Sequence, residues 1–144
     1  MVLHFPSIPV SSTNTESYSL TATTRAIEMT KIAARGALGK VAENLVALDV
    51  SIPFVLADTF LIVSGRNERQ VSAIADGVEE AMLLEGHKLL RREGKTTGRW
   101  ILLDFGDIIC HVMHEEDRIF YDIERLWKDC PVISLADVEA PAEI

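Results

Sequence analysis

Two carboxylates, Asp104 and Asp107, are the residues of this sequence that are best spaced for chemistry. Between them lies Phe105-Gly106, and a two-residue hairpin turn there would place the two carboxylates opposite each other on one face of a sheet. Carboxylates paired in this way can hold Mg²⁺. No phosphate-cradling loop adjoins the pair, so we interpret it as a solvated turn, with a magnesium site as the alternative.

A second cluster of metal-ligand types follows at His111, His114 and the acidic run Glu115, Glu116 and Asp117. Two histidines three residues apart on a strand point to opposite faces of the sheet, so they cannot share a metal unless the backbone breaks there. The pattern instead indicates a histidine packed on a sheet, followed by the solvated acidic first turn of a helix, where carboxylates are favourable.

Two short motifs resemble those of nucleotide enzymes. Gly94-Lys95-Thr96 matches the end of a P-loop, but Leu89 stands where the first glycine is required. Asp104-Phe105-Gly106 matches the magnesium-binding tripeptide of protein kinases, but the glycine-rich and catalytic loops of a kinase are missing. We therefore predict no catalysis, no cofactor and no metal.

Charge and composition narrow the choice of partner. The 144 residues carry 14 basic and 22 acidic side chains, for a formal net charge of −8. Such a chain disfavours direct binding to nucleic acid or to anionic membranes and suits a basic protein partner. No apolar run approaches the length of a membrane span. The two cysteines have no CxxC spacing, which predicts reduced thiols and a cytoplasmic location.

Apolar periodicity predicts an α/β fold, a mixed β-sheet with flanking helices in the order α-β-β-α-β-β-β-α. Before residue 21 we expect a disordered extension or sequence from an early start codon (residues 1–20), and after residue 131 a C-terminal tail (residues 132–144). The expected helices are residues 24–46, 67–84 and 116–127, and the expected strands are residues 47–52, 59–64, 88–92, 99–105 and 107–114.

The two strands around Phe105-Gly106 form the most distinctive predicted element. The turn pairs Trp100 with His111 and Leu102 with Ile109 on one face, while the opposite face is almost continuously aliphatic and suits a core under helices. The mixed face has two interpretations. In the first, this face packs beneath the last helix. In the second, it stays open until another protein covers it, since a Trp among aliphatic residues with an acidic rim is typical of interface centres.

Three blocks of this sequence resemble the ribosomal silencing factor (Iojap-like) family: residues 60–70 (FLIVSGRNERQ), 98–112 (GRWILLDFGDIICHV) and 120–127 (FYDIERLW). The resemblance covers residues 21–131, which we take as the domain, and is greatest to actinobacterial members. Phe105 stands where Tyr is usual, and Cys110 where Val is usual.

The resemblance implies a nucleotidyltransferase-like fold without the catalytic carboxylates, and so no enzyme, with a nucleotidyltransferase-like enzyme or nucleotide-binding protein as the alternative. The resemblance further implies that the protein forms a homodimer and represses translation. The repressor would bind the large ribosomal subunit through ribosomal protein number fourteen and sterically block joining of the small subunit during starvation. We expect Phe120, Ile123 and Trp127 in the core. The expected partner contacts are Trp100, Leu102, Asp104, Phe105, Asp107, Ile109, His111, Met113 and Tyr121.

Overall fold

The computed structural model describes residues 20–94 and 97–139. Apart from Leu20, the extension predicted for residues 1–20 lies outside this range, as do Lys95 and Thr96 of the P-loop-like motif. Among the described helices, none is both long and apolar enough to cross a membrane. The helices are α1 (Thr24–Leu38), α2 (Glu68–Leu84), α3 (Glu115–Tyr121), α4 (Ile123–Leu126) and α5 (Ala136–Glu139). The strands are β1 (Glu43–Asp49), β2 (Thr59–Gly65), β3 (Arg91–Glu93), β4 (Trp100–Asp104), β5 (Ile108–His114) and β6 (Val132–Ile133).

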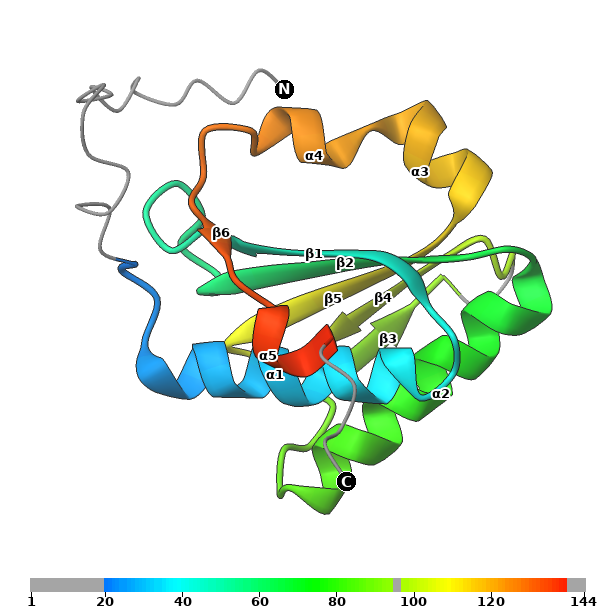
Figure 1. Ribbon diagram of the computed structural model, residues 1–144, viewed down its shortest axis with the longest axis horizontal. Coiled ribbons are helices and arrows are strands. Elements are labelled where there is room, and N and C mark those ends of the chain that lie inside the picture. The colour runs from blue at the N-terminus through cyan, green and yellow to red at the C-terminus, as the bar shows by residue number, and fades with distance from the viewer. Residues whose placement is uncertain (1–19, 95–96, 140–144) are drawn as a thin grey trace.

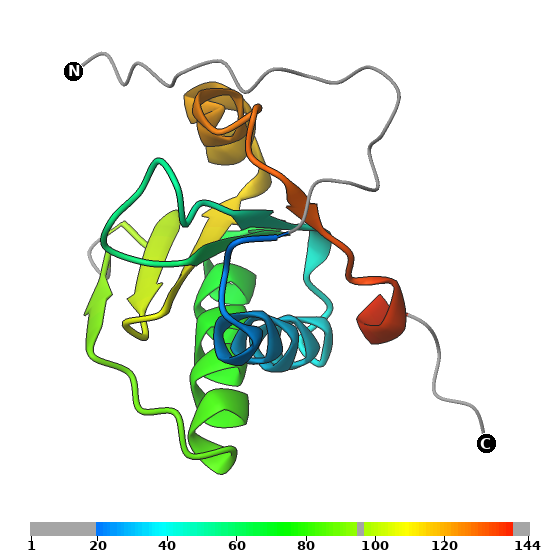
Figure 2. The ribbon, with the colours of Figure 1, turned by 90° about the vertical axis from the view of Figure 1, so that its left-hand side faces the viewer.

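The strands form one mixed sheet in the order β3-β4-β5-β2-β1-β6, which confirms the predicted fold class. The central pair, β2 and β5, is parallel, and all other neighbouring strands are antiparallel. Helices α1 and α2 cover one face of the sheet, and α3 and α4 lie over the other (Figures 1 and 2). Every residue of β2 is buried, as expected for a strand that helices cover on both sides.

Each face of the sheet has its own apolar core. Under α1 and α2 the core includes Leu61, Val63 and Leu103, and under α4 it includes Phe60, Ile123 and Trp127. The expectation that Ile123 and Trp127 are core residues is therefore confirmed. Phe120 is the exception, because it is 79% exposed.

The first helix is shorter than the predicted range of residues 24–46. It ends at Leu38, and residues 43–49 form strand β1 instead. The chain reverses through left-handed backbone at Val41 (φ 63°), whose carbonyl accepts a hydrogen bond from the Gln70 side-chain amide at 3.0 Å. A second left-handed residue, Asn44, lies at an irregularity in the pairing of β1 with β2. The apolar stripe that predicted one long helix thus continues into a strand.

Helix α1 crosses α2 at two glycines, Gly36 and Gly77. A Cβ atom on Gly36 would lie 2.7 Å from the carbonyl oxygen of Gly77 and 2.8 Å from the Cβ of Ala81. Real Cβ atoms do not approach other atoms so closely, so Gly36 is required by the helix contact rather than by flexibility.

The chain from residue 132, predicted as a tail, belongs to the fold as far as residue 139. Val132 and Ile133 pair with Leu48 and Ala47 as edge strand β6. Helix α5 then lies beside α1 (Figure 1), where Lys31 and Asp137 form an ion pair of 3.1 Å. Two apolar residues in this segment, Ile133 and Leu135, are buried in the larger core, which explains why the segment is ordered.

The last helix, predicted as one element over residues 116–127, is broken into α3 and α4. Asp122 between them has a left-handed backbone (φ 45°), which ends α3 and redirects the chain. An ion pair of 2.8 Å between Arg118 and Glu124 spans the break. The break gives α3 and α4 different orientations over the sheet.

Candidate functional site

The hairpin between β4 and β5 turns one residue later than predicted. Trp100 pairs with Met113, Leu102 with His111, and Asp104 with Ile109. The amide of Phe105 donates to the carbonyl of Ile108, so the turn residues are Gly106 and Asp107. Gly106 has φ +88°, a conformation that glycine adopts without strain and that suits the first position of a hairpin turn.

This shift separates the two candidate carboxylates. Asp104 accepts a hydrogen bond from the amide of Gly106 at 2.8 Å, whereas Asp107 lies in the turn and pairs with Arg25 at 3.3 Å. The prediction that Asp104 and Asp107 face each other is therefore wrong. The described residues contain no group of three or more side chains placed to hold a metal.

A shift of two in the pairing leaves every side chain on the face where the sequence placed it, because side chains alternate along a strand. Trp100, Leu102 and Asp104 share their face with Ile109, His111 and Met113. Phe105 falls on the other face and is buried in the core under α1 and α2. Phe105, an expected partner contact, is therefore not accessible on the mixed face.

The mixed face divides into a part that is buried under the last helices and a part that stays accessible. Met113 is fully buried and belongs to the core under α4, and His111 is 7% exposed. Trp100, Leu102, Asp104 and Ile109 are only half-buried. The buried part of the face is thus next to β2, and the accessible part is on β4 and the start of β5.

Aromatic rings join the two parts of this face. The indole Nε1–H of Trp100 donates to Nδ1 of His111 at 3.2 Å, and the His111 ring lies 4.9 Å from the Phe60 ring in an edge-to-face arrangement. On its other side, Trp100 lies 5.1 Å from the ring of Tyr121 in α3. Trp100 is therefore fixed in position while part of its ring stays accessible.

His111 is held neutral in this setting. Its Nδ1 accepts a hydrogen bond, so the ring proton is on Nε2, which is buried without a hydrogen-bond partner. Burial lowers the pKa of His111 from 6.5 to about 4. A neutral, buried imidazole is suited to packing rather than to acid–base chemistry at neutral pH.

We expect this histidine to make stability fall in mild acid. Between pH 6.5 and 4 the unfolded chain takes up a proton at His111 that the folded protein does not. The free energy of unfolding should therefore drop by up to about 1.4 kcal/mol per pH unit, or about 3 kcal/mol in all, relative to a variant without the histidine. Urea titrations at pH 7, 6, 5 and 4 on the wild type and His111→Gln measure this difference. Parallel pH profiles for the two proteins would contradict it.

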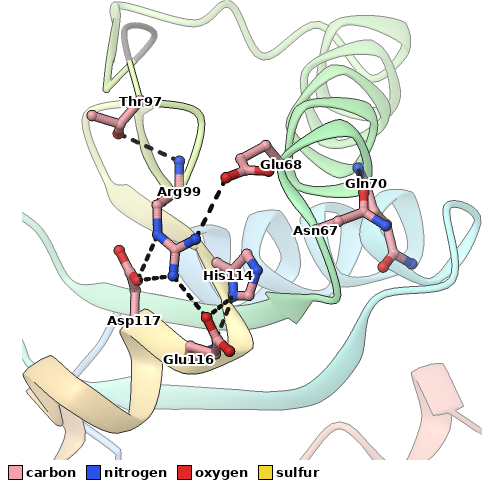
Figure 3. Close-up of polar contacts among 8 residues, drawn as sticks. All are labelled: Asn67, Glu68, Gln70, Thr97, Arg99, His114, Glu116 and Asp117. Atoms are coloured by element: carbon pink, nitrogen blue, oxygen red, sulfur yellow. Dashed lines mark hydrogen bonds and ion pairs between the residues drawn. The ribbon is translucent and has the colours of Figure 1, made fainter.

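The carboxyl ends of the parallel strands, where open α/β sheets usually bind ligands, are occupied by side chains of the protein itself. Arg99 lies there between the first turns of α2 and α3 (Figure 3). Its guanidinium pairs with Asp117 at 2.7 Å, Glu116 at 3.1 Å and Glu68 at 3.4 Å. The bonds to Asp117 and Glu116 raise the pKa of Arg99, so it stays charged.

The two helix starts beside Arg99 are likewise satisfied internally. Asn67 accepts from the amide of Gln70 at 2.9 Å to begin α2, and Nδ1 of His114 accepts from the amide of Glu116 at 3.1 Å to begin α3 (Figure 3). Carboxylates therefore stand where a phosphate-binding site would present free amides and positive charge.

A family model and several known proteins are similar in sequence to this chain. Residues 23–144 match the family model described as "Ribosomal silencing factor during starvation". A ribosomal silencing factor of Halalkalibacterium halodurans is 38% identical over 77% of this chain and 95% of its own length. One of Bacillus subtilis is 39% identical over 73% of this chain and 89% of its own length.

The chain belongs to the ribosomal silencing factor family. A crystal structure of a Chromobacterium violaceum protein has the same fold, with a TM-score of 0.68 and 33% identity over 70% of this chain and 84% of that one. Ribosomal silencing factors are regulatory and non-enzymatic, and membership supports a ribosome-associated role in silencing translation.

The two cysteines are poorly suited to act as nucleophiles. Both are free thiols. Burial raises the pKa of Cys110 to about 12, and burial, with the nearby charges of Asp49 and Asp129, raises the pKa of Cys130 to about 11. Both thiols are therefore protonated at neutral pH, whereas a cysteine nucleophile reacts as the thiolate.

The sequence did not reveal how Arg99, Arg118 and Phe120 are placed around α3. Arg99 and Arg118 were not among the candidate residues, and Phe120 was expected in the core. Arg118 is 9% exposed and donates to Ser64 Oγ at 2.8 Å and to the backbone oxygen of Asn44. A single charged residue in a short helix gives no periodic signal, so only the three-dimensional arrangement reveals it.

Proposed function

We propose that this protein represses translation by binding the large ribosomal subunit through ribosomal protein number fourteen, so that the small subunit cannot join. The family description, which names silencing during starvation, supports this role and the condition under which it acts. We place this activity in the cytoplasm. The mechanism is steric exclusion, which requires a surface that binds the large subunit and no catalytic site.

The accessible half of the mixed sheet face is the observation that carries this proposal. Trp100, Leu102 and Ile109 lie side by side there, half-buried, on two paired strands. Tyr121 extends the surface onto α3 with half of its side chain exposed. A fixed aromatic residue among aliphatic neighbours is the usual centre of a protein interface.

Charge around this face favours a basic protein over ribosomal RNA. Asp104 lies on this face, in a chain of net charge −8, and the exposed Asp107 follows in the turn, where it pairs with Arg25. Carboxylates at a rim attract basic partners, speed association and repel a phosphate backbone. Met113 and Phe105 are not part of the proposed contact surface because they are buried, and His111 supports Trp100 from below.

Sedimentation with isolated ribosomal subunits tests the proposal. We expect the purified protein to pellet with the large subunit and not with the small one, and to bind purified ribosomal protein number fourteen directly. Pelleting with the small subunit, with both subunits equally or with neither would contradict the proposal. Binding to large-subunit RNA stripped of protein would contradict the assignment of a protein partner.

We also propose a homodimer. Analytical ultracentrifugation over a concentration series measures it, and the same series on a variant of the sheet face shows whether self-association uses the surface that meets the ribosome. A sedimentation coefficient that does not change with concentration, at the value of a monomer, would contradict the dimer.

A further inference from the structure

Helix α3 presents its apolar residues to solvent and buries a charge. Ile119 is 80% exposed and Phe120 is 79% exposed, whereas Arg118 is 9% exposed. A surface helix normally turns its apolar stripe toward the core and its charged residues toward water. The arrangement in α3 is the reverse.

Two arginines fix α3 in this orientation. Arg118 donates hydrogen bonds to Ser64 and Asn44 of the sheet. Arg99, the residue before β4, forms an ion pair with Asp117 in the first turn of α3. Turning α3 to bury Phe120 would carry Arg118 out to solvent and break these bonds, so the Asn44 carbonyl and the buried Ser64 hydroxyl would lose their donor, which is costly for a buried group. The exposure of Ile119 and Phe120 is therefore built into the fold.

The exposed apolar residues of α3 are continuous with the proposed ribosome-binding face. The Phe120 ring lies 4.9 Å from the Tyr121 ring, which lies 5.1 Å from Trp100. An open groove of about 650 Å³ lies at the junction of α3 and α4. Its apolar lining is Ile119, Phe120 and Tyr121 of α3 and Leu126 of α4, which is 51% exposed. Exposed apolar side chains thus extend from β4 along α3 to a groove at α4 whose other lining residues are charged.

The groove itself is balanced in charge, but a second hollow that shares Ile119 with it is acidic. Asp122 and Asp129 line the groove beside Arg125 and Lys128. The second hollow is lined by Glu115, Glu116, Asp122 and Glu124, with Arg118 as its basic residue. This excess of carboxylates matches the charge at the edge of the sheet face, so both parts of the surface suit the same basic partner.

We propose that Ile119 and Phe120 form a second contact site for the large-subunit protein that binds the Trp100 face, and that this protein wraps the edge of α3. The site takes an apolar side chain of the partner flanked by lysines or arginines. This inference rests on the proposed function, because it assigns the occupant of α3 to the same ribosomal partner.

The test compares two serine variants of equally exposed residues. Phe120 and Leu84 are both 79% exposed, but Leu84 lies at the end of α2, on the helix that covers the opposite face of the sheet (Figure 1). We expect Phe120→Ser to weaken pelleting with the large subunit at least about tenfold and Leu84→Ser to leave it unchanged. Thermal unfolding should show both variants as stable as the wild type, because neither side chain is buried.

The outcomes of this test distinguish failure of the α3 contact from failure of the proposed function. If the wild type pellets with the large subunit and Phe120→Ser does so equally well, the α3 contact is overturned and the proposed function stands. If Phe120→Ser changes only self-association in the ultracentrifuge, α3 meets a second copy of the chain, and the α3 contact is again overturned. If the wild type does not pellet, both proposals fail together.

Discussion

Trp100→Ala should weaken binding to the large ribosomal subunit by about 30-fold or more, which corresponds to about 2 kcal/mol. The substitution removes the ring at the centre of the accessible face and the hydrogen bond to His111, and it leaves Tyr121 without its aromatic neighbour. Quantitative pelleting with a titration of large subunits measures the loss. Trp100 is half-buried, so we expect the variant to fold.

Trp100→Phe is the matched control for this substitution. It keeps an aromatic ring between His111 and Tyr121 and removes only the indole N–H, so we expect binding within a few-fold of the wild type. Circular dichroism and thermal unfolding establish that both variants are folded. A folded Trp100→Ala protein that binds like the wild type would show that the partner uses another surface.

Gly36→Ala should lower the free energy of unfolding by about 2–3 kcal/mol, although alanine normally favours a helix. The added methyl group would lie 2.7 Å from the backbone oxygen of Gly77, and a backbone atom cannot move aside as a flexible side chain can. We expect α1 and α2 to separate locally and the core between them to loosen. Urea unfolding followed by circular dichroism measures the change.

Gly39→Ala provides the control at the end of the same helix. The nearest atoms to an added methyl group there lie 3.5 Å away, and the residue has right-handed helical backbone. We expect a change of less than about 1 kcal/mol in either direction. Equal losses of stability at Gly36 and Gly39 would show that the glycine pair is not a tight helix contact.

The sequence predicted the mixed sheet and most elements within a few residues, because alternating and helical apolar periods are strong signals in residues 59–84 and 99–114. The faces of the hairpin were also predicted correctly despite the wrong turn. Its pairing is shifted by two residues, and only an odd shift would move side chains to the other face. The residues at the accessible face could therefore be named in advance.

The errors lie where tertiary contacts override local pattern. Residues 43–46 continue the apolar stripe of α1, yet they pair with β2 as a strand. Phe120 was expected in the core, but Arg99 and Arg118 hold α3 in the orientation that exposes it. Residue type alone favours burying Phe120 rather than Arg118, and only the tertiary contacts of the two arginines reverse this preference.

The parallel pairing of β2 with β5 also bears on how the newly made chain folds. These two strands form the centre of the sheet, yet α2, β3 and β4 separate them along the chain. Contacts between distant segments form slowly, because the entropy of closing a long loop is lost before any burial compensates it. The last residue of β5 is His114, and edge strand β6 ends at Ile133. The central sheet therefore cannot assemble during synthesis until nearly the whole domain has emerged from the ribosome that made it.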